Sequence, residues 1–393
     1  MLSRRLILAG PALAGLSRNT VAQSRRDGAG MDIVLLSADS GAAAVQAVND
    51  VVARIRTPNV NLRGETAPDV LNSIARLADR PTAVGAMLPS VSLAYMTLSG
   101  LPEHVVHANR FIGRMGVSEL HVLASQRVGS LRDLAGQKVA VGPKGSSTQA
   151  TAAVWLDRTG FRIEPLYLED EQALNAVLRG QIPAMMLLAP KPARQFFDLN
   201  VSDGVHFLPV DVLGGKPAGL FPAQIMPADY PLLAGGEAGM GRPVATIGVP
   251  LVLACYNWSP MTPMFLGLAR LTDLLIERGS GLPGFDMAAD VGGWQRFPPV
   301  AAWLAKGGTV MDAALAERRS PAAAVDASRS TTTTSRTAPP PDAGSAVPRP
   351  PPDADNAVPG PLPQPRRPPA GTGLSAAEKE RLFQQFLNWR RQQ

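Results

Sequence analysis

Between residue 31 and about residue 312, short β-type runs alternate with helical stretches, and this alternation constrains the fold more than any other feature. The run Asp32–Leu36 leads through the polar stretch Ser37–Gly41 into a helical stretch at 42–55. Such a succession is typical of α/β architecture. Further strands are expected at 60–62, 83–88, 119–124, 138–141, 165–168, 182–188 and 244–254, and further helices at 67–78, 149–157, 169–179, 193–199 and 264–278.

Two of the apolar runs indicate how this pattern is divided. The strand–helix units restart after the strand at 119–124, and the long run at 244–254 is placed to return the chain to the first group of units. We therefore expect two lobes joined by two hinge crossover strands. The first lobe would comprise residues 31–117 and 247–312, and the second residues 118–246. Because α/β sheets bind ligands outside the carboxyl ends of their strands, a cleft is expected between the lobes.

The charge distribution argues against a nucleic-acid partner. The chain carries a net charge of +6, but residues 23–316 hold 24 basic and 25 acidic side chains, so the body is nearly neutral. A nucleic-acid-binding module concentrates positive charge to neutralise phosphates. With one cysteine and four scattered histidines, the chain also lacks the residues for an internal disulfide or a Cys/His zinc cluster. Cys255, within an apolar run, is expected in the core.

Residues 1–22 have the organisation of a secretory signal peptide. Arg4 and Arg5 precede the apolar run Leu6–Leu16, and the small residues Thr20 and Ala22 fit a cleavage site. The alternative is a buried or membrane-spanning helix, but a bilayer needs roughly 20 apolar residues. The arginine pair partly resembles a twin-arginine motif. We therefore expect a periplasmic protein whose signal peptide is removed.

The C-terminal region changes composition twice. Residues 317–373 contain 14 prolines and a Ser/Thr run, and almost no large apolar residue, so we expect a disordered linker. Residues 374–393 then open with the capping box Ser375–Glu378 and continue with an apolar stripe that includes Phe383 and Phe386. This amphipathic helix would either dock on the body or fray, or it would reach a partner or a membrane surface.

The loop Gly142–Thr148 is the strongest candidate for a binding site. It follows a buried strand and opens a helix, so its free N–H groups and hydroxyls would form a seat for an anion such as a carboxylate. It is neither a P-loop nor a Rossmann glycine motif. The other interpretation is that Gly142, Ser146, Ser147 and Thr148 only shape the turn and cap the helix.

An ordered series of segments resembles a known family. The series comprises Ser130–Ser146 preceded by Glu119–Val122, then Glu171, Ala173, Leu174 and Gly180 before Met185, Pro190–Pro192, Met226–Pro231 and Val244–Pro250. Together these segments resemble the substrate-binding subunits of TAXI-type TRAP transporters, over roughly residues 31–312. The resemblance implies a type II periplasmic-binding-protein fold. It also implies a receptor that captures a small organic anion or amino acid and delivers it to a membrane permease driven by an ion gradient.

The same resemblance implies the residues that face the ligand. From the first lobe these are Ser37, Asp39, Ser40, Gly41 and Ser90, and from the second lobe Gly142, Ser146, Ser147, Thr148 and Lys191, with Pro190 nearby. No catalytic residue, metal or cofactor is implied.

The chain departs from the family pattern in three places. The family's first loop carries a Gly-Thr-Gly-Gly run, whereas Ser37–Gly41 has one glycine and the carboxylate of Asp39, which would repel an anion or bind the ammonium of an amino acid. Leu88–Ser90 replaces a more polar stretch, and the tail lies outside the family plan.

Two further functions compete with a transport receptor. One is a periplasmic ligand-sensing or scaffold protein that binds a partner through its C-terminal tail. The other is an enzyme, but the sequence contains no Gly-x-Ser-x-Gly elbow, cofactor loop or clear catalytic set. His121 lies on an apolar strand and is interpreted as a core or hinge residue. Lys144 and Lys191 would either bind anions or remain solvated.

Deleting residues 317–393 separates the receptor from the scaffold. The ligand affinity of a receptor should be unchanged, because its cleft lies in the body, whereas a scaffold should lose its association with its partner. Calorimetric titration of both forms measures the first property, and co-purification measures the second. A large loss of solute affinity on truncation would contradict the receptor interpretation.

Overall fold

The structure is a computed structural model that describes residues 31–78, 82–210, 219–233 and 241–320. All of these residues belong to the unit of the chain that ends at Ala323. The expected signal peptide, Pro-rich linker and terminal helix lie outside the described residues. In the described part of the chain, no helix is both long enough and apolar enough to cross a membrane.

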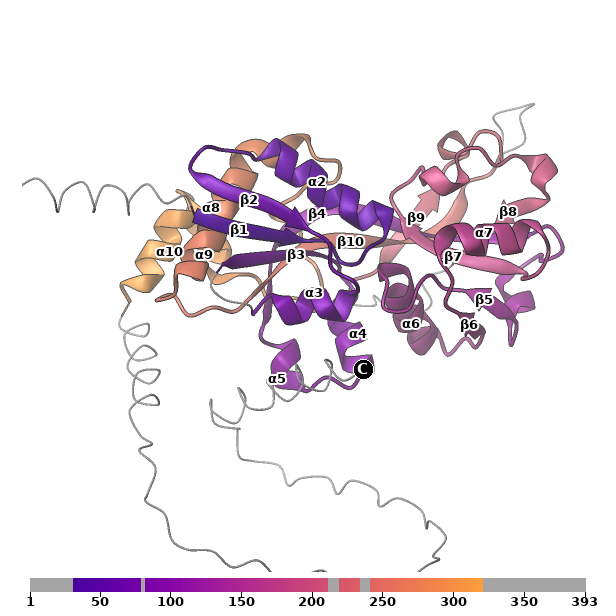
Figure 1. The fold of residues 1–393 in the computed structure, drawn as a ribbon, viewed down its shortest axis with the longest axis horizontal. Helices are drawn as coiled ribbons and strands as arrows, with labels where there is room; N and C mark the ends of the chain where they lie inside the picture. The colour runs from indigo at the N-terminus through magenta and orange to yellow at the C-terminus, as the bar shows by residue number, and fades with distance from the viewer. Residues whose placement is uncertain (1–30, 79–81, 211–218, 234–240, 321–393) are drawn as a thin grey trace, which may run out of the picture. The chain divides into compact units, whose positions relative to one another are not determined.

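The first lobe is built on parallel strands that follow one another through helices (Figure 1). β1 pairs with β2 on one side and with β3 on the other. The two intervening helices are α2 and α3, and the carboxyl end of β1 leads into the loop that contains Asp39. The bounds are β1 Met31–Leu36, α2 Ala42–Arg54, β2 Val60–Glu65, α3 Val70–Arg76 and β3 Ala83–Pro89.

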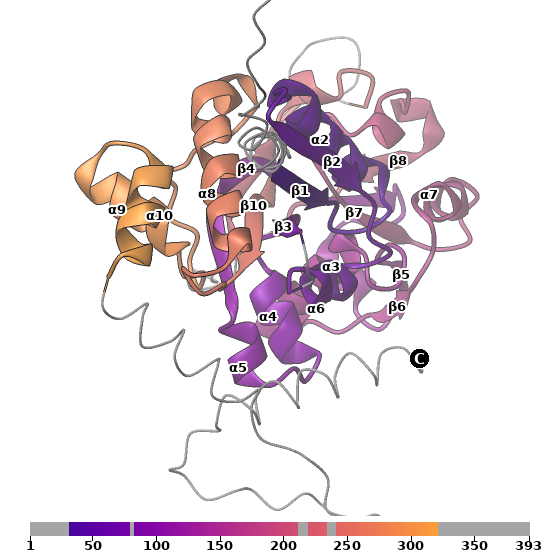
Figure 2. The same ribbon diagram turned by 60° about the vertical axis from the view of Figure 1, so that its left-hand side comes forward.

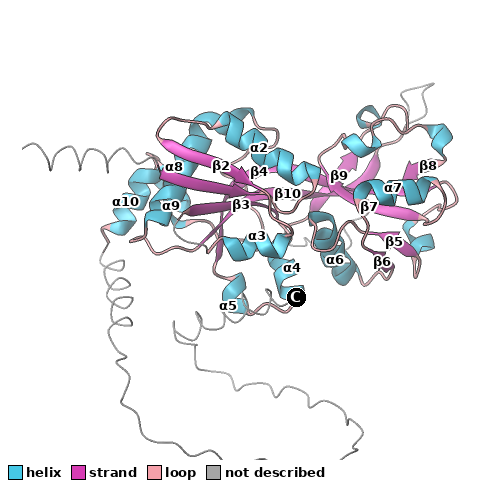
Figure 3. Ribbon diagram, in the orientation of Figure 1, coloured by secondary structure: helices cyan, strands magenta, loops and turns pink. Residues whose placement is uncertain are grey.

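The second lobe repeats this arrangement. β5 pairs in parallel with β6 and with β7, and two short strands, β8 and β9, join the sheet as antiparallel partners of the crossover strands. Helices lie on both sides of the strands in each lobe (Figure 3). The bounds are β5 Lys138–Ala140, α6 Ser147–Thr159, β6 Glu164–Leu166, α7 Asp170–Leu178, β7 Ala184–Ala189, β8 Val205–Phe207 and β9 Phe221–Ile225.

Two long strands run from one lobe into the other. β4 spans Asn109–Ser125 and β10 spans Val244–Tyr256, and they pair with each other in antiparallel fashion from Asn109 to Glu119. Beyond that stretch β4 pairs with β7, while the start of β10 pairs with β9. The fold is therefore two-lobed α/β with two crossover strands, as the sequence predicted. The lobe boundaries at 117/118 and 246/247 fall inside these strands and stay a prediction.

Helices from two other parts of the chain complete the described structure. α8 packs on β1 and β3, and α9 and α10 lie beside it (Figure 2). Between β3 and β4 the chain forms α4 and α5, and α4 packs against α6 of the second lobe. The bounds are α4 Ser92–Leu98, α5 Glu103–Val106, α8 Pro263–Arg278, α9 Pro298–Lys306 and α10 Val310–Arg318.

Buried side chains form different clusters in the two lobes, and the cluster beside α6 also includes Val91, which precedes α4. In the first lobe, Ile33, Leu253 and Leu268 belong to one cluster that joins β1, β10 and α8. In the second lobe, one cluster includes Val139 and Val154 on the α6 side of the sheet, and another includes Phe196. Cys255 is fully buried in β10, as its apolar surroundings predicted, and burial raises the pKa of its thiol.

Three expected helices differ from those observed. The segment at 193–199 was expected to be a helix, but it forms only a single 3₁₀ turn, Arg194–Phe196. This turn follows Pro192 and ends at the buried Phe196. The first helix after β2 begins at Val70 instead of residue 67, because Pro68 precedes the N-cap Asp69, whose carboxylate accepts a hydrogen bond from the Asn72 N–H. α6 begins two residues earlier than expected, at Ser147.

Truncating the core of α8 should destabilise the protein strongly. Leu268→Ala removes a side chain that is 0% exposed, so the free energy of unfolding should fall by about 2–5 kcal/mol. Leu304→Ala, on α9 at 40% exposure, is the matched control and should change it by less than about 0.5 kcal/mol. Urea denaturation measures both, and equal effects would contradict the assigned core.

Candidate functional site

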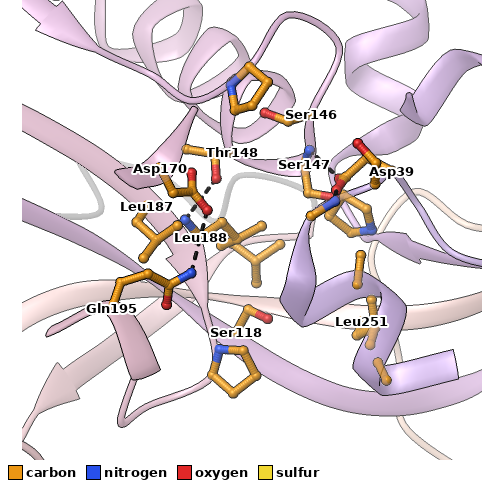
Figure 4. A pocket seen from close by; sticks show the side chains of 18 of the residues that line it. Asp39, Ser118, Ser146, Ser147, Thr148, Asp170, Leu187, Leu188, Gln195 and Leu251 are labelled. Carbon is orange, nitrogen blue, oxygen red and sulfur yellow. Dashed lines mark hydrogen bonds between the residues drawn. The ribbon is translucent and has the colours of Figure 1, made fainter. Parts of the chain in front are cut away.

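A small cavity of about 100 Å³ lies between the lobes, at the carboxyl ends of strands from both (Figure 4). The first lobe contributes the loop after β1, and the second lobe contributes the start of α6 and the end of β7. Ser118 of β4 and Leu251 of β10 line the cavity where these strands cross between the lobes. Of the residues expected in the site, Asp39, Ser40, Gly41, Ser146, Ser147 and Thr148 line the cavity.

Asp39 reaches across the cleft to the N-terminus of α6. The Ser147 N–H donates a hydrogen bond to Asp39 Oδ2 at 2.7 Å, and the Ser147 hydroxyl donates to the same oxygen at 2.5 Å. The Gly41 N–H donates to Asp39 Oδ1 at 2.7 Å. Ser147 is the first residue of α6, so its N–H has no partner within the helix and lies at the positive end of the helix dipole. The seat expected for an anion therefore holds Asp39.

The first-lobe loop is fixed in the shape that places Asp39 there. The buried Ser37 hydroxyl donates to the Asp39 carbonyl at 2.6 Å and accepts from the Ala67 N–H at 3.1 Å. Ser37 consequently stabilises the loop from its buried side and does not line the cavity. Ser40 and Gly41 follow and lead into α2.

The second-lobe loop is fixed by its own hydroxyl groups. The Ser146 hydroxyl caps α6 by accepting from the Gln149 N–H at 3.2 Å, and the Thr148 hydroxyl accepts from the Leu188 N–H at 3.0 Å. Gly142 has φ +79°, and a Cβ there would lie 2.9 Å from both Ser146 Oγ and Thr148 Cβ. Gly142 thus permits the turn without lining the cavity. Ser146 and Thr148 line the cavity, but their hydroxyls also stabilise the loop through these hydrogen bonds.

Two other expected site residues lie outside the cavity lining. The Ser90 hydroxyl donates to the Gly219 carbonyl, and the Ser90 carbonyl accepts from the Trp294 indole N–H at 2.7 Å. Lys191 is turned to the opposite side of its loop, where its ammonium donates to the Gln224 carbonyl and lies 3.5 Å from Asp229. Lys144 lines the rim and is exposed.

Four polar residues of the cavity were not anticipated from the sequence. They are Ser118 in β4, Glu169 and Asp170 at the start of α7, and Gln195 in the 3₁₀ turn after β7. The Gln195 amide lies 3.5 Å from Asp170 Oδ2 as donor to acceptor. The available signal was the position of Glu169 and Asp170 in the short connection from β6 to α7, where the carboxyl end of a strand leads to the start of a helix.

The cavity is more acidic than the sequence indicated. Burial raises the pKa of Asp170, and the negative charges of Asp39 and Glu169 raise it further. In the part of the chain that the structure describes, no ion pair includes Asp39, so hydrogen bonds and the α6 dipole stabilise its charge. The described residues also form no group of three or more His, Cys, Asp or Glu that could hold a metal ion.

A larger chamber of about 410 Å³ adjoins the small cavity on the side of the crossover strands. The two share five lining residues, which are Ala47, Ser118, Pro190, Gln195 and Leu251. Most other walls of the larger chamber are apolar and include Met87, Met115 and Leu282. The cleft therefore combines a small polar end at α6 with a roomier apolar part near the crossover strands.

His121 belongs to a buried network outside this cleft. Its Nδ1 lies 3.0 Å from the Glu119 carbonyl and its Nε2 lies 2.8 Å from the Tyr230 hydroxyl, which in turn accepts from the Ala193 N–H at 2.6 Å. The ring also packs against Phe196 and Phe207. His121 thus links β4 to the 3₁₀ turn after β7 as a core residue.

Comparisons with known proteins give one family match and a set of similar solved structures. Residues 102–261, from α5 to beyond β10, match the model of the NMT1-like family. A comparison with curated proteins gives no match. Among solved structures, the chain is similar to a TctC solute-binding protein from Polaromonas, with 14% identity, coverage of 65% of this chain and 90% of that chain, and a TM-score of 0.37.

Two further solved structures are similar at comparable levels. One is MatC from Rhodopseudomonas palustris with bound malate, at 13% identity, coverage of 72% and 98%, and a TM-score of 0.40. The other is the alkanesulfonate-binding protein SsuA from Xanthomonas axonopodis pv. citri bound to MOPS, at 16% identity, coverage of 78% and 92%, and a TM-score of 0.34.

The His121 network should make stability depend on pH. Burial lowers the pKa of His121 from 6.5 to about 4, so the unfolded chain binds a proton that the folded protein excludes. The stabilisation that comes from burying His121 in its neutral form is complete above pH 6.5 and is lost as the pH falls toward 4. Over this window the free energy of unfolding should fall by about 1.4 kcal/mol per pH unit on account of His121.

Denaturation of His121→Gln at several pH values measures this contribution. The variant should be less stable at pH 7, and its free energy of unfolding should depend less steeply on pH between 4 and 6.5. His206→Gln is the control, because His206 is only partly buried and its lowered pKa should give a smaller change. An unaltered slope in His121→Gln would contradict the assignment.

Proposed function

We propose that the protein is a periplasmic solute-binding receptor that captures a small organic anion or amino acid in the interlobe cleft. Delivery of this solute to an ion-gradient-driven TRAP permease is part of the proposal and rests on the resemblance of the ordered segments to TAXI-type subunits. The observation that most directly supports the proposal is that one cleft is lined by both lobes and by both crossover strands. A solute bound there contacts both lobes and stabilises the closed arrangement.

The size and walls of the cleft suit a small molecule. The larger chamber, at about 410 Å³, falls within the range of about 300–1,000 Å³ that is usual for ligand pockets. Its apolar walls would hold the body of the solute, and the polar groups of Ser118 and Gln195, where the two chambers meet, would orient it.

The side chains of the cleft favour binding over catalysis. The Ser147 hydroxyl donates to Asp39, and the Ser146 and Thr148 hydroxyls accept from main-chain N–H groups. His121, which could serve as a base, is instead bound to Tyr230 in the buried network. Of these hydroxyls, that of Ser147 is paired with a carboxylate, but Asp39 also accepts from two main-chain N–H groups, an arrangement that favours a structural contact over an activated nucleophile.

The second candidate is a ligand-sensing or scaffold protein that binds a partner through the C-terminal tail. The composition of residues 317–393 is the observation that favours it. Because α10 extends to Arg318, a truncation that separates the two functions should begin at residue 324, after the end of the first unit. Cutting at 317 would remove Glu317 and Arg318, the last two residues of a helix that packs on α8.

Screening the mature protein by thermal shift against amino acids and organic acids tests the receptor function. A bound solute should stabilise the fold saturably, by about 2.7 kcal/mol at 100 times its dissociation constant. Replacing Ser146 and Thr148 by alanine would be a poor test of the site, because both hydroxyls also hold the loop together. If no solute in the screen stabilises the protein saturably, the receptor function is rejected.

Filling the cleft gives a cleaner test of where the solute binds. Ala47→Trp on α2 places an indole into both chambers and should weaken binding at least about tenfold. Ala53→Trp, on an exposed face of the same helix, is the matched control and should bind normally. Calorimetry measures both, and undiminished binding by Ala47→Trp would place the solute elsewhere.

A further inference from the structure

The N-terminus of α6 carries its own anion. Asp39 is 4% exposed, and its carboxylate accepts three hydrogen bonds, two of them from Ser147 on the opposite lobe (Figure 4). The two residues are 108 positions apart in sequence, so this contact joins the lobes directly. An N–H at a helix start with an adjacent hydroxyl is a good site for a carboxylate group.

We propose that Asp39 is a tethered carboxylate that occupies the α6 N-terminus and competes there with any external carboxylate. Together with the Val70–Gly145 and Tyr95–Gln149 hydrogen bonds, the contact holds the lobes together when no solute is bound, and a carboxylate-bearing solute binds at Ser147 only after Asp39 has left. This inference deepens the proposed function and rests on it for the solute that would be captured.

The surrounding structure shows why the two carboxylates exclude each other. The cavity at this end holds only about 100 Å³, and Glu169 and Asp170 already line it. A second anion beside Asp39 would meet like charges in a poorly solvated space, which costs free energy. Both Ser147 donors point to one oxygen of Asp39, so no Ser147 donor remains for a second acceptor.

Neighbouring contacts keep Asp39 close to Ser147. The Val70 N–H at the start of α3 donates to the Gly145 carbonyl at 2.9 Å, just before α6. The Tyr95 hydroxyl of α4 donates to Gln149 Oε1 at 2.8 Å. Because Asp39 is part of the same chain and its loop is fixed, its effective concentration at Ser147 is high. An untethered carboxylate must overcome this advantage.

Removing the tethered carboxylate should open the seat to a free one. Asp39→Ala leaves the Ser147 N–H and hydroxyl without their acceptor, and formate is the smallest carboxylate probe. Thermal unfolding is followed against sodium formate, with sodium chloride at equal ionic strength as reference. We expect formate-specific, saturable stabilisation of Asp39→Ala, with an apparent dissociation constant at least about tenfold lower than for the unaltered protein.

Two matched variants show whether this response arises at Ser147. Asp170→Ala removes another carboxylate from the same cavity but no partner of Ser147, so it should not acquire the formate response. Asp39→Ala combined with Ser147→Ala should respond more weakly than Asp39→Ala alone, because one of the two donors is gone. An equal response in Asp170→Ala, or no difference between Asp39→Ala and the unaltered protein, would overturn the proposal.

A second measurement concerns the contact between the lobes. Small-angle scattering of the solute-free protein should give a larger radius of gyration for Asp39→Ala than for the unaltered protein, and an equal radius would overturn the proposed role of Asp39 in holding the lobes together. If Asp39→Ala does not fold, Asp39→Asn takes its place in both measurements. Its neutral amide keeps the shape but retains one acceptor oxygen for the three donors, so the same direction of change is expected.

The outcomes separate this inference from the proposed function. Formate binding by Asp39→Ala, with no solute bound by either form in the screen, would support the role of Asp39 and reject the receptor. A saturable solute in the screen, with no formate response in Asp39→Ala or Asp39→Asn, would support the receptor and reject the role of Asp39.

Discussion

The antiparallel pairing of β4 with β10 is the constraint on which the two-lobed structure depends. The pairing runs from Asn109 opposite Tyr256 to Glu119 opposite Gly248, and each strand then continues with a different partner in the second lobe. The lobes are therefore joined by a pair of hydrogen-bonded strands. Movement of one lobe relative to the other would require these strands to bend or twist. Register shifts at Leu251/Val252 and Leu253/Ala254 interrupt the ladder. Such irregularities increase local twist and mark the places where a sheet bends.

This connection also determines where a solute can bind. β4 and β10 form the floor of the cleft through Ser118, Val249 and Leu251, and across this floor the carboxyl end of β1 lies opposite the start of α6. The polar loops expected from the sequence meet at that point. Their hydroxyls mostly stabilise the loops, while the open volume lies toward the crossover strands. The fold thus places the room for a solute beside the expected anion seat instead of directly on it.

Most of the alternation of strands and helices was readable because those elements have a strong local pattern, as in Asp32–Leu36 or the long run at 244–254. The sequence did not indicate α4, α5, α9, α10 or residues 109–118 of β4. The 3₁₀ turn at Arg194–Phe196 was not readable, because burial of Phe196 against the His121 network ends a segment whose local pattern favoured a helix. β8 and β9 have few residues and depend on the crossover strands for their pairing. In the site, the loops were found from their composition, but the partner of each hydroxyl depends on contacts between residues distant in sequence.

The charged side chains of the small cavity are mostly acidic, which under the proposed function favours a zwitterion over a simple anion there, while Arg194 and Asp50 line the larger chamber. Lys191 is bound to Asp229 and Gln224, so it is turned away from the cavity, and Lys144 lies exposed at the rim. Asp39, Glu169 and Asp170 face a small space whose main positive feature is the start of α6. In the proposed exchange, the charge of Asp39 remains near the cleft after Asp39 leaves Ser147, and it disfavours a ligand that carries only negative charge. The ammonium of an amino acid would compensate that charge, while its carboxylate takes the hydrogen bonds of Ser147.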